Sequence, residues 1–265
     1  MRIVKTQDAE LRCAHLPRPG APALLLINSL GTSLEIWDDQ VEAFAERFEL
    51  IRYDARGHGK SIRGEADELT IDQLARDALA VLDSCGIARA HICGLSLGGM
   101  TTMQIARHWP DRVLKIALCS TSPHMPPRER WQQIIQTTLT QGVGALTDSI
   151  LDRWFTPEFR AAQPAQVERI RQMLLTMDPR GYAACCAAIR DLDLREDIKS
   201  IDAKTLVIGG TKDPGTTPEH AELIARSIQG AKLVMLESAH LSNIERAPQF
   251  TAELLDFLAA EALPG

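Results

Sequence analysis

Short apolar runs alternate with amphipathic segments along the first half of the chain. The runs are four to seven residues long, too short for helices, and therefore predict buried strands. Continuous apolar strands separated by amphipathic helices are typical of a parallel sheet covered by helices on both faces. The predicted strands are 23–27, 48–53, 90–93 and 113–119, and the predicted helices are 37–47, 71–85 and 99–108.

This alternation stops at about residue 122, and helical periodicity alone continues to about residue 199. Strand patterns then return, which indicates an α/β core of residues 1–121 and 200–265 with an all-helical lid, 122–199, inserted into it. Ligands of open α/β sheets bind at the carboxyl ends of the strands, so we expect the lid there. The helices predicted in the lid are 131–141, 143–154, 164–177 and 180–192, followed by strands 205–208 and 232–236 and a helix 248–260.

Ser96 stands between two glycines, in Gly94-Leu95-Ser96-Leu97-Gly98, after a predicted strand and before a predicted helix. Only glycine fits beside so tight a strand–turn–helix, which holds the serine in a strained, exposed position. The pattern is that of a nucleophile elbow, and Ser96 is the candidate nucleophile.

A serine nucleophile needs a histidine base, which in turn needs a carboxylate to orient it. In the elbow fold the chain order is serine, acid, histidine. Asp213 and His240 fit this order, because each lies in a loop at the end of one of the two late strands. Other candidates are placed less well, the acids Asp191, Asp193 and Glu237 and the histidines His15, His58, His91, His108, His124 and His220.

Attack on a carbonyl develops negative charge on oxygen, which preorganised backbone N–H groups stabilise. We expect one N–H from Leu97, the residue after the nucleophile, and another from Leu30, in the loop after strand 23–27. A further turn-rich loop, 54–61, follows strand 48–53. Its His58 precedes the serine in the chain, so we interpret it as structural.

Charge and motifs exclude several classes of function. The net charge of −6 and the lack of a basic tract argue against nucleic-acid binding. With no signal-like N-terminus and no apolar run that could span a bilayer, we expect a cytoplasmic protein without membrane association. The six cysteines show no C-x-x-C spacing, and nucleotide-binding and zinc motifs are missing, so we expect no metal and no cofactor.

Several segments resemble known proteins. The chain looks like an α/β-hydrolase and, within that superfamily, resembles the 3-oxoadipate enol-lactonases of bacterial aromatic catabolism. The Asn28-Ser29 pair is the most specific match, since most of the superfamily has His-Gly there. After Asp213, Pro214 departs mildly from the pattern and could alter the acid loop slightly. The matching segments are 26–32, 52–59, 93–99, 153–156, 210–213 and 239–245.

The resemblance implies an activity, the opening of an enol-lactone ring to 3-oxoadipate in the β-ketoadipate pathway. Ser96 would attack, His240 would act as base, and water would release the acyl group without a cofactor. The implied substrate is a small anionic lactone whose carboxylate calls for a cation in the lid. Arg153 is the candidate, with Arg130 or Arg190 as replacements, and Trp131 and Trp154 would form apolar walls.

Other activities use the same triad. A general carboxylesterase, a cofactor-free haloperoxidase-like enzyme and a carbon–carbon bond hydrolase are the alternatives, because lid shape selects the substrate. Epoxide hydrolases and haloalkane dehalogenases fit less well, since an aspartate replaces the serine there. A binding protein without activity is disfavoured by the complete triad. We expect a monomer or a small homo-oligomer.

Overall fold

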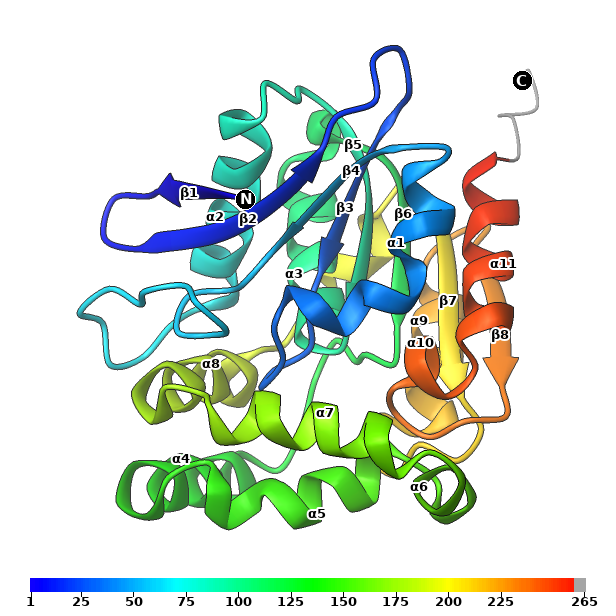
Figure 1. The fold of residues 1–265 in the computed structure, drawn as a ribbon. Helices are drawn as coiled ribbons and strands as arrows, with labels where there is room; N and C mark the ends of the chain where they lie inside the picture. Colours follow the sequence, from blue (N-terminus) through cyan, green and yellow to red (C-terminus); the bar gives the residue numbers. More distant parts are fainter. Residues whose placement is uncertain (260–265) are drawn as a thin grey trace.

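The computed structural model describes residues 1–259, which form one twisted sheet with helices on both faces and a helical cap (Figure 1). The sheet order is β1-β2-β4-β3-β5-β6-β7-β8; β2 pairs antiparallel with β1 and β4, and the remaining pairs are parallel. The strands are β1 (Arg2–Lys5), β2 (Glu10–Leu16), β3 (Ala23–Ile27), β4 (Glu49–Tyr53), β5 (Ala90–Leu95), β6 (Val113–Cys119), β7 (Lys204–Gly210) and β8 (Lys232–Leu236).

The central strands are buried along their length because helices cover both faces. Every residue of β3 and β5 is buried, which explains their continuous apolar sequences. On one face α2 and α3 pack together and α9 packs on β7 and β8; α1 packs against α11 on the other. The core helices are α1 (Asp38–Ala45), α2 (Ile71–Ser84), α3 (Leu97–His108), α9 (Pro218–Ser227), α10 (Ser242–Glu245) and α11 (Ala247–Ala259), with 3-10 turns η1 (Leu34–Trp37), η2 (Pro110–Arg112) and η3 (Asp197–Ser200).

Five helices between β6 and β7 form the cap, which lies across the carboxyl ends of the parallel strands (Figure 1). The chain enters and leaves the cap at one place: His124 and Asp193 form an antiparallel bridge, and Leu194 N–H donates to the Pro123 carbonyl oxygen at 2.8 Å. The cap helices are α4 (Arg128–Gln141), α5 (Gly144–Trp154), α6 (Pro157–Ala162), α7 (Pro164–Leu175) and α8 (Pro179–Asp191).

The register brings the site loops together. β3 and β5 are neighbours, with Ile27 opposite Gly94, so the loop after β3 lies beside the residue that follows β5. β7 and β8 are also neighbours, with Gly210 opposite Leu236. The strand order reverses between β3 and β5, which is where open α/β sheets bind ligands.

The predicted α/β-hydrolase fold, a mostly parallel sheet covered by helices, is confirmed, whereas the hairpin of β1 and β2 was not predicted. Short helices α6 and α10 were also missed. The last predicted helix corresponds to α11, but its final residue, Ala260, lies outside the described residues. No helix within residues 1–259 combines the length and apolar character needed to cross a membrane.

Candidate active site

Ser96 lies in a sharp turn between β5 and α3. Its φ of 55° is in the left-handed region, which costs free energy for a residue with a side chain and is typical of functional sites. A Cβ on Gly94 would collide with the Gly98 carbonyl group, so the turn requires glycine there. Ser96 N–H donates to the Cys119 carbonyl oxygen at 2.8 Å, which ties the elbow to β6.

Asp213 and His240 meet at the ends of β7 and β8. Asp213 Oδ2 lies 2.7 Å from His240 Nδ1, and both side chains are buried. The other carboxylate oxygen, Oδ1, accepts from Gly215 N–H at 2.8 Å and Thr216 N–H at 3.0 Å, and Thr216 Oγ1 donates to Oδ2 at 2.6 Å. Pro214 therefore sits in a tight turn that wraps the carboxylate instead of displacing it.

The carboxylate of Asp213 is held in its charged form. Burial opposes the charge, but the facing His240 and the hydrogen bonds from Thr216 and Gly215 outweigh it, so the pKa of Asp213 lies below its usual value. A charged carboxylate at Nδ1 leaves Nε2 of His240 as the nitrogen available to a nucleophile.

Ser96 and His240 line the same cavity, of about 80 Å³. No hydrogen bond joins Ser96 Oγ to His240 within the part of the chain that the structure describes. Hydrogen bonds between a nucleophile and its base are often long before substrate binds, so the lack of one here is compatible with a Ser96–His240–Asp213 triad.

The N–H groups of Leu30 and Leu97 have no acceptor among residues 1–259. Leu97 is the first residue of α3, where N–H groups have no partner within the helix. The loop of Leu30 is anchored by Asn28, whose Nδ2 donates to the Tyr53 carbonyl oxygen at 2.8 Å and whose Oδ1 accepts from Trp37 Nε1 at 2.9 Å. Two unpaired donors thus flank the nucleophile.

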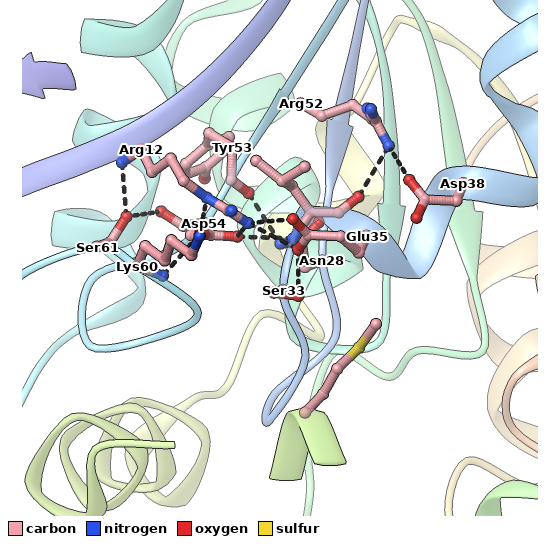
Figure 2. Close-up of polar contacts among 12 residues, drawn as sticks. Arg12, Asn28, Ser33, Glu35, Asp38, Arg52, Tyr53, Asp54, Lys60 and Ser61 are labelled. Carbon is pink, nitrogen blue, oxygen red and sulfur yellow. Dashed lines mark hydrogen bonds and ion pairs between the residues drawn. The ribbon is translucent and has the colours of Figure 1, made fainter. Parts of the chain in front are cut away.

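A network of polar side chains around Asp54 lies at the base of this loop (Figure 2). Asp54, fully buried after β4, accepts from Leu34 N–H at 2.7 Å and from Arg12 Nε at 2.6 Å. Arg12 also binds Glu35, and Lys60 N–H donates to Asp54 at 2.9 Å. Asp54 therefore connects loop 54–61 to the segment that follows the oxyanion loop.

The cap supplies an aromatic wall and two cations. Trp154 stacks on His240, with ring centroids 6.2 Å apart and planes inclined by 19°, and Trp131 is fixed by its Nε1, which donates to the Met125 carbonyl oxygen at 2.8 Å. Arg153 and Arg130, both half-buried, line the cavity as well. A second cavity, of about 250 Å³ between α4 and α5, shares both arginines with the first.

Neither guanidinium has a hydrogen-bond or acidic partner within residues 1–259. Burial and the positive charge of Arg130 lower the pKa of Arg153. Removing a cation from water without an acid to pair with it costs free energy. The pair therefore points to an anionic ligand.

The structure brings together all the predicted site residues except Leu97, which contributes through its backbone and is not part of the cavity wall. The competing groups lie elsewhere: Asp191 pairs with Arg128 and Arg190, and Asp193 pairs with Arg195. His58 is buried, with Nδ1 3.2 Å from the Arg56 carbonyl oxygen, and does not line the cavity.

Sequence reasoning missed three contributors. Thr216 binds the acid, and the short polar turn after Asp213 could have indicated it. Glu245 accepts hydrogen bonds from Ala239 N–H at 3.0 Å and from the Thr156 hydroxyl group, which links the histidine loop to the cap. Ser29 lines the cavity beside Leu30. No local pattern indicates the role of Glu245, whereas Ser29 belongs to the Asn28-Ser29 pair that carries the family resemblance, although its place in the cavity was not predicted.

The mostly parallel sheet and the serine in a sharp strand–helix turn are features of α/β-hydrolases, and comparison with known proteins gives the same class. Residues 22–247 match the family described as "alpha/beta hydrolase fold". The chain belongs to the α/β-hydrolase family. The predicted resemblance to the 3-oxoadipate enol-lactonases and the prediction of a hydrolytic enzyme are both confirmed by the relatives below.

The chain is 35% identical to 3-oxoadipate enol-lactonase 2 of Acinetobacter baylyi, over 92% of this chain and 91% of that protein. It is 32% identical to 3-oxoadipate enol-lactonase 1 of the same organism, over 87% and 86%. Among solved structures, the enol-lactonase from Burkholderia xenovorans LB400 superposes with a TM-score of 0.93 at 40% identity, covering 95% of this chain and 97% of that one.

Proposed function

We propose that this protein hydrolyses 3-oxoadipate enol-lactone to 3-oxoadipate, within the breakdown of aromatic compounds in the cytoplasm. The observation that carries the proposal is one small cavity that combines Ser96, the Asp213–His240 pair and two arginines without acidic partners. The named activity of the Acinetobacter and Burkholderia relatives supports it.

In the proposed reaction, Ser96 Oγ attacks the ring carbonyl carbon while His240 Nε2 takes the hydroxyl proton. The Leu30 and Leu97 N–H groups stabilise the oxyanion, and Asp213 holds the imidazolium that forms. The ring C–O bond then breaks, the leaving enolate oxygen takes the proton from His240 Nε2, which restores the neutral imidazole, and the resulting enol tautomerises to a ketone.

Water completes the cycle. His240 accepts a proton from water, whose oxygen attacks the acyl carbon, and Ser96 leaves with the proton. The product has gained one carboxylate relative to the substrate. During both steps Arg153, with Arg130 beside it, would bind the carboxylate that the substrate already carries, since a guanidinium matches a carboxylate's geometry.

The test compares wild type with Ser96→Ala on the enol-lactone and on neutral p-nitrophenyl acetate. We expect wild type to favour the lactone at least tenfold in kcat/KM, the low end for a charged hydrogen bond, and Ser96→Ala to lose about 10⁴- to 10⁶-fold in kcat. Equal or better turnover of the neutral ester would favour the general carboxylesterase alternative. More than a tenth of wild-type activity in Ser96→Ala would exclude Ser96 as nucleophile.

A further inference from the structure

Ser29 carries a buried hydroxyl group that the fold does not use. Its side chain is buried, with the residue 2% exposed, and it lines the catalytic cavity together with Leu30, Ser96 and His240. Among residues 1–259 its hydroxyl group makes one hydrogen bond, to the Leu30 carbonyl oxygen at 3.5 Å, which is at the outer limit for such an interaction. A buried hydroxyl group whose hydrogen bond is this long costs free energy, and a bound ligand that accepts a shorter hydrogen bond from it would remove that cost.

Other groups fix the backbone at Ser29. Its carbonyl oxygen accepts from Thr32 Oγ1 at 2.8 Å and from Thr32 N–H at 3.3 Å. The preceding residue, Asn28, is anchored on both sides by Tyr53 and Trp37. The loop would therefore keep its shape without the Ser29 hydroxyl group.

We propose that Ser29 Oγ–H is a third donor to the substrate oxygen that becomes negative during attack, beside the N–H groups of Leu30 and Leu97. A serine hydroxyl hydrogen rotates freely, so it can leave the distant Leu30 carbonyl oxygen and turn into the cavity. The hydroxyl group keeps its proton throughout and stabilises charge only. This inference rests on the proposed serine mechanism and adds a catalytic residue to it.

A donor of this kind acts on the transition state. It lowers the barrier most where charge is greatest, so its removal affects kcat more than KM. The effect does not depend on whether the substrate carries a carboxylate. These two properties separate an oxyanion donor from a residue that binds the distal carboxylate.

The experiment measures kcat and KM of wild type, Ser29→Ala and Ser238→Ala on both p-nitrophenyl acetate and the enol-lactone, with thermal unfolding of each protein. Ser238 is the matched control, because its hydroxyl group is also buried, has no hydrogen-bond partner within residues 1–259, and lies outside the wall of the catalytic cavity. We expect Ser29→Ala to lose about 10- to 100-fold in kcat on both esters, with KM within twofold and an unchanged melting temperature. Ser238→Ala should keep wild-type kinetics.

Three results would overturn the proposal: wild-type kcat in Ser29→Ala, a loss confined to KM for the anionic lactone, or a loss that follows a fall in melting temperature. The same experiment tests the proposed substrate independently of Ser29. If wild type hydrolyses p-nitrophenyl acetate and leaves the lactone intact, the substrate assignment is wrong, while the two serine variants still test Ser29 on the neutral ester.

Discussion

The carboxylate of Asp213 is held by hydrogen bonds on both of its oxygens. It accepts from His240, from the Thr216 hydroxyl group and from two backbone N–H groups, and it is buried. Each bond fixes its orientation, and together they keep its charge, so the imidazole of His240 is held in one tautomer. At the residue scale, replacing one carboxylate oxygen of Asp213 by an amide nitrogen would therefore disturb the site without changing the shape of the side chain.

We expect Asp213→Asn to lower kcat by about 10³- to 10⁴-fold, because an amide favours the wrong imidazole tautomer while preserving shape. Steady-state kinetics on the enol-lactone measure the loss. Asp191→Asn, which alters a surface acid paired with Arg128 and Arg190, is the control and should remain fully active. The reverse result would move the acid's role to Asp191.

For Arg153 we expect opposite effects on binding and on stability. Arg153→Met should lower kcat/KM for the anionic lactone by about 1.5–3 kcal/mol, the range for hydrogen bonds to charged groups, and leave p-nitrophenyl acetate turnover nearly unchanged. Since burial and Arg130 disfavour the charge of Arg153, the melting temperature should stay equal or rise. Parallel kinetics on both esters and a thermal scan provide the data.

Arg190→Met is the control for Arg153, because Arg190 already pairs with Glu68 and Asp191 at the surface. It should affect neither substrate selectively. Equal losses on both esters in Arg153→Met would indicate a packing defect and transfer the anion-binding role to Arg130.

The sequence allowed Ser96, Asp213 and His240 to be proposed because their signals are local: an elbow between glycines and two loops that each follow a strand. The contributions of Thr216, Glu245 and Ser29 to the site were not predicted from the sequence, for different reasons. The hydrogen bonds of Glu245 reach Thr156, 89 residues away in the chain. The role proposed for Ser29 depends on the 3.5 Å distance between its hydroxyl oxygen and the Leu30 carbonyl oxygen, which a sequence does not show.

At the scale of elements, the histidine loop and the cap are joined by few but specific contacts. Glu245 of α10 accepts from Ala239 N–H and from Thr156, which caps α6, and Leu241 N–H donates to the Trp154 carbonyl oxygen at 3.1 Å. The aromatic wall and the base are thus held by the same short segments, so a shift of one shifts the other.

Glu245→Gln replaces one carboxylate oxygen with a donor that faces another donor. We expect about 1–3 kcal/mol of lost stability and a fall in kcat, measured by chemical denaturation and steady-state kinetics. Thr156→Val should produce a similar loss. Because both variants break the same contact, the double variant should lose less than the sum, and additive losses would show that the two residues act independently.

Strand β2, which sequence reasoning missed, contains a charged residue whose partners lie 23 and 42 residues away in the chain. Four consecutive residues of β2, 11–14, are buried, and one of them, Arg12, is charged and pairs there with Asp54 and Glu35 (Figure 2). A charged residue at a buried position weakens a strand pattern. The central strands were predicted because their burial shows directly as an unbroken apolar run.

For the whole molecule, the buried His91 of β5 predicts acid sensitivity. Burial, and then the charge of Lys115, lower the pKa of His91 to about 4. In the unfolded chain histidine titrates near pH 6.5, so between about pH 6.5 and 4 the unfolded state binds more protons and stability falls as the pH falls. At pH 5 the cost is about 2 kcal/mol.

Denaturant unfolding of wild type and His91→Leu at several pH values from 7.5 to 4.5 measures this effect. The variant should lose less stability on acidification than wild type does, whatever its stability at pH 7.5. Ile92→Val, which changes a buried residue of the same strand and removes no titratable group, is the control and should follow the wild-type slope. Parallel slopes in all three proteins would contradict the prediction.

The two ends of the cap meet at the His124–Asp193 bridge, so the roughly seventy residues between them connect two points of the core that lie side by side, as a tight turn does. The entropic cost of closing a loop grows only slowly with its length, so an insert of another size could join the same two ends at little extra cost. Grafting another cap at this point would leave β6 and β7 in register, but the His240 loop would keep its place only if the new cap replaced the contacts made by Thr156 and Trp154. A cap exchange would therefore rebuild the wall of the cavity from new residues, while Ser96, Asp213 and His240, which all lie outside the cap, stay in the chain.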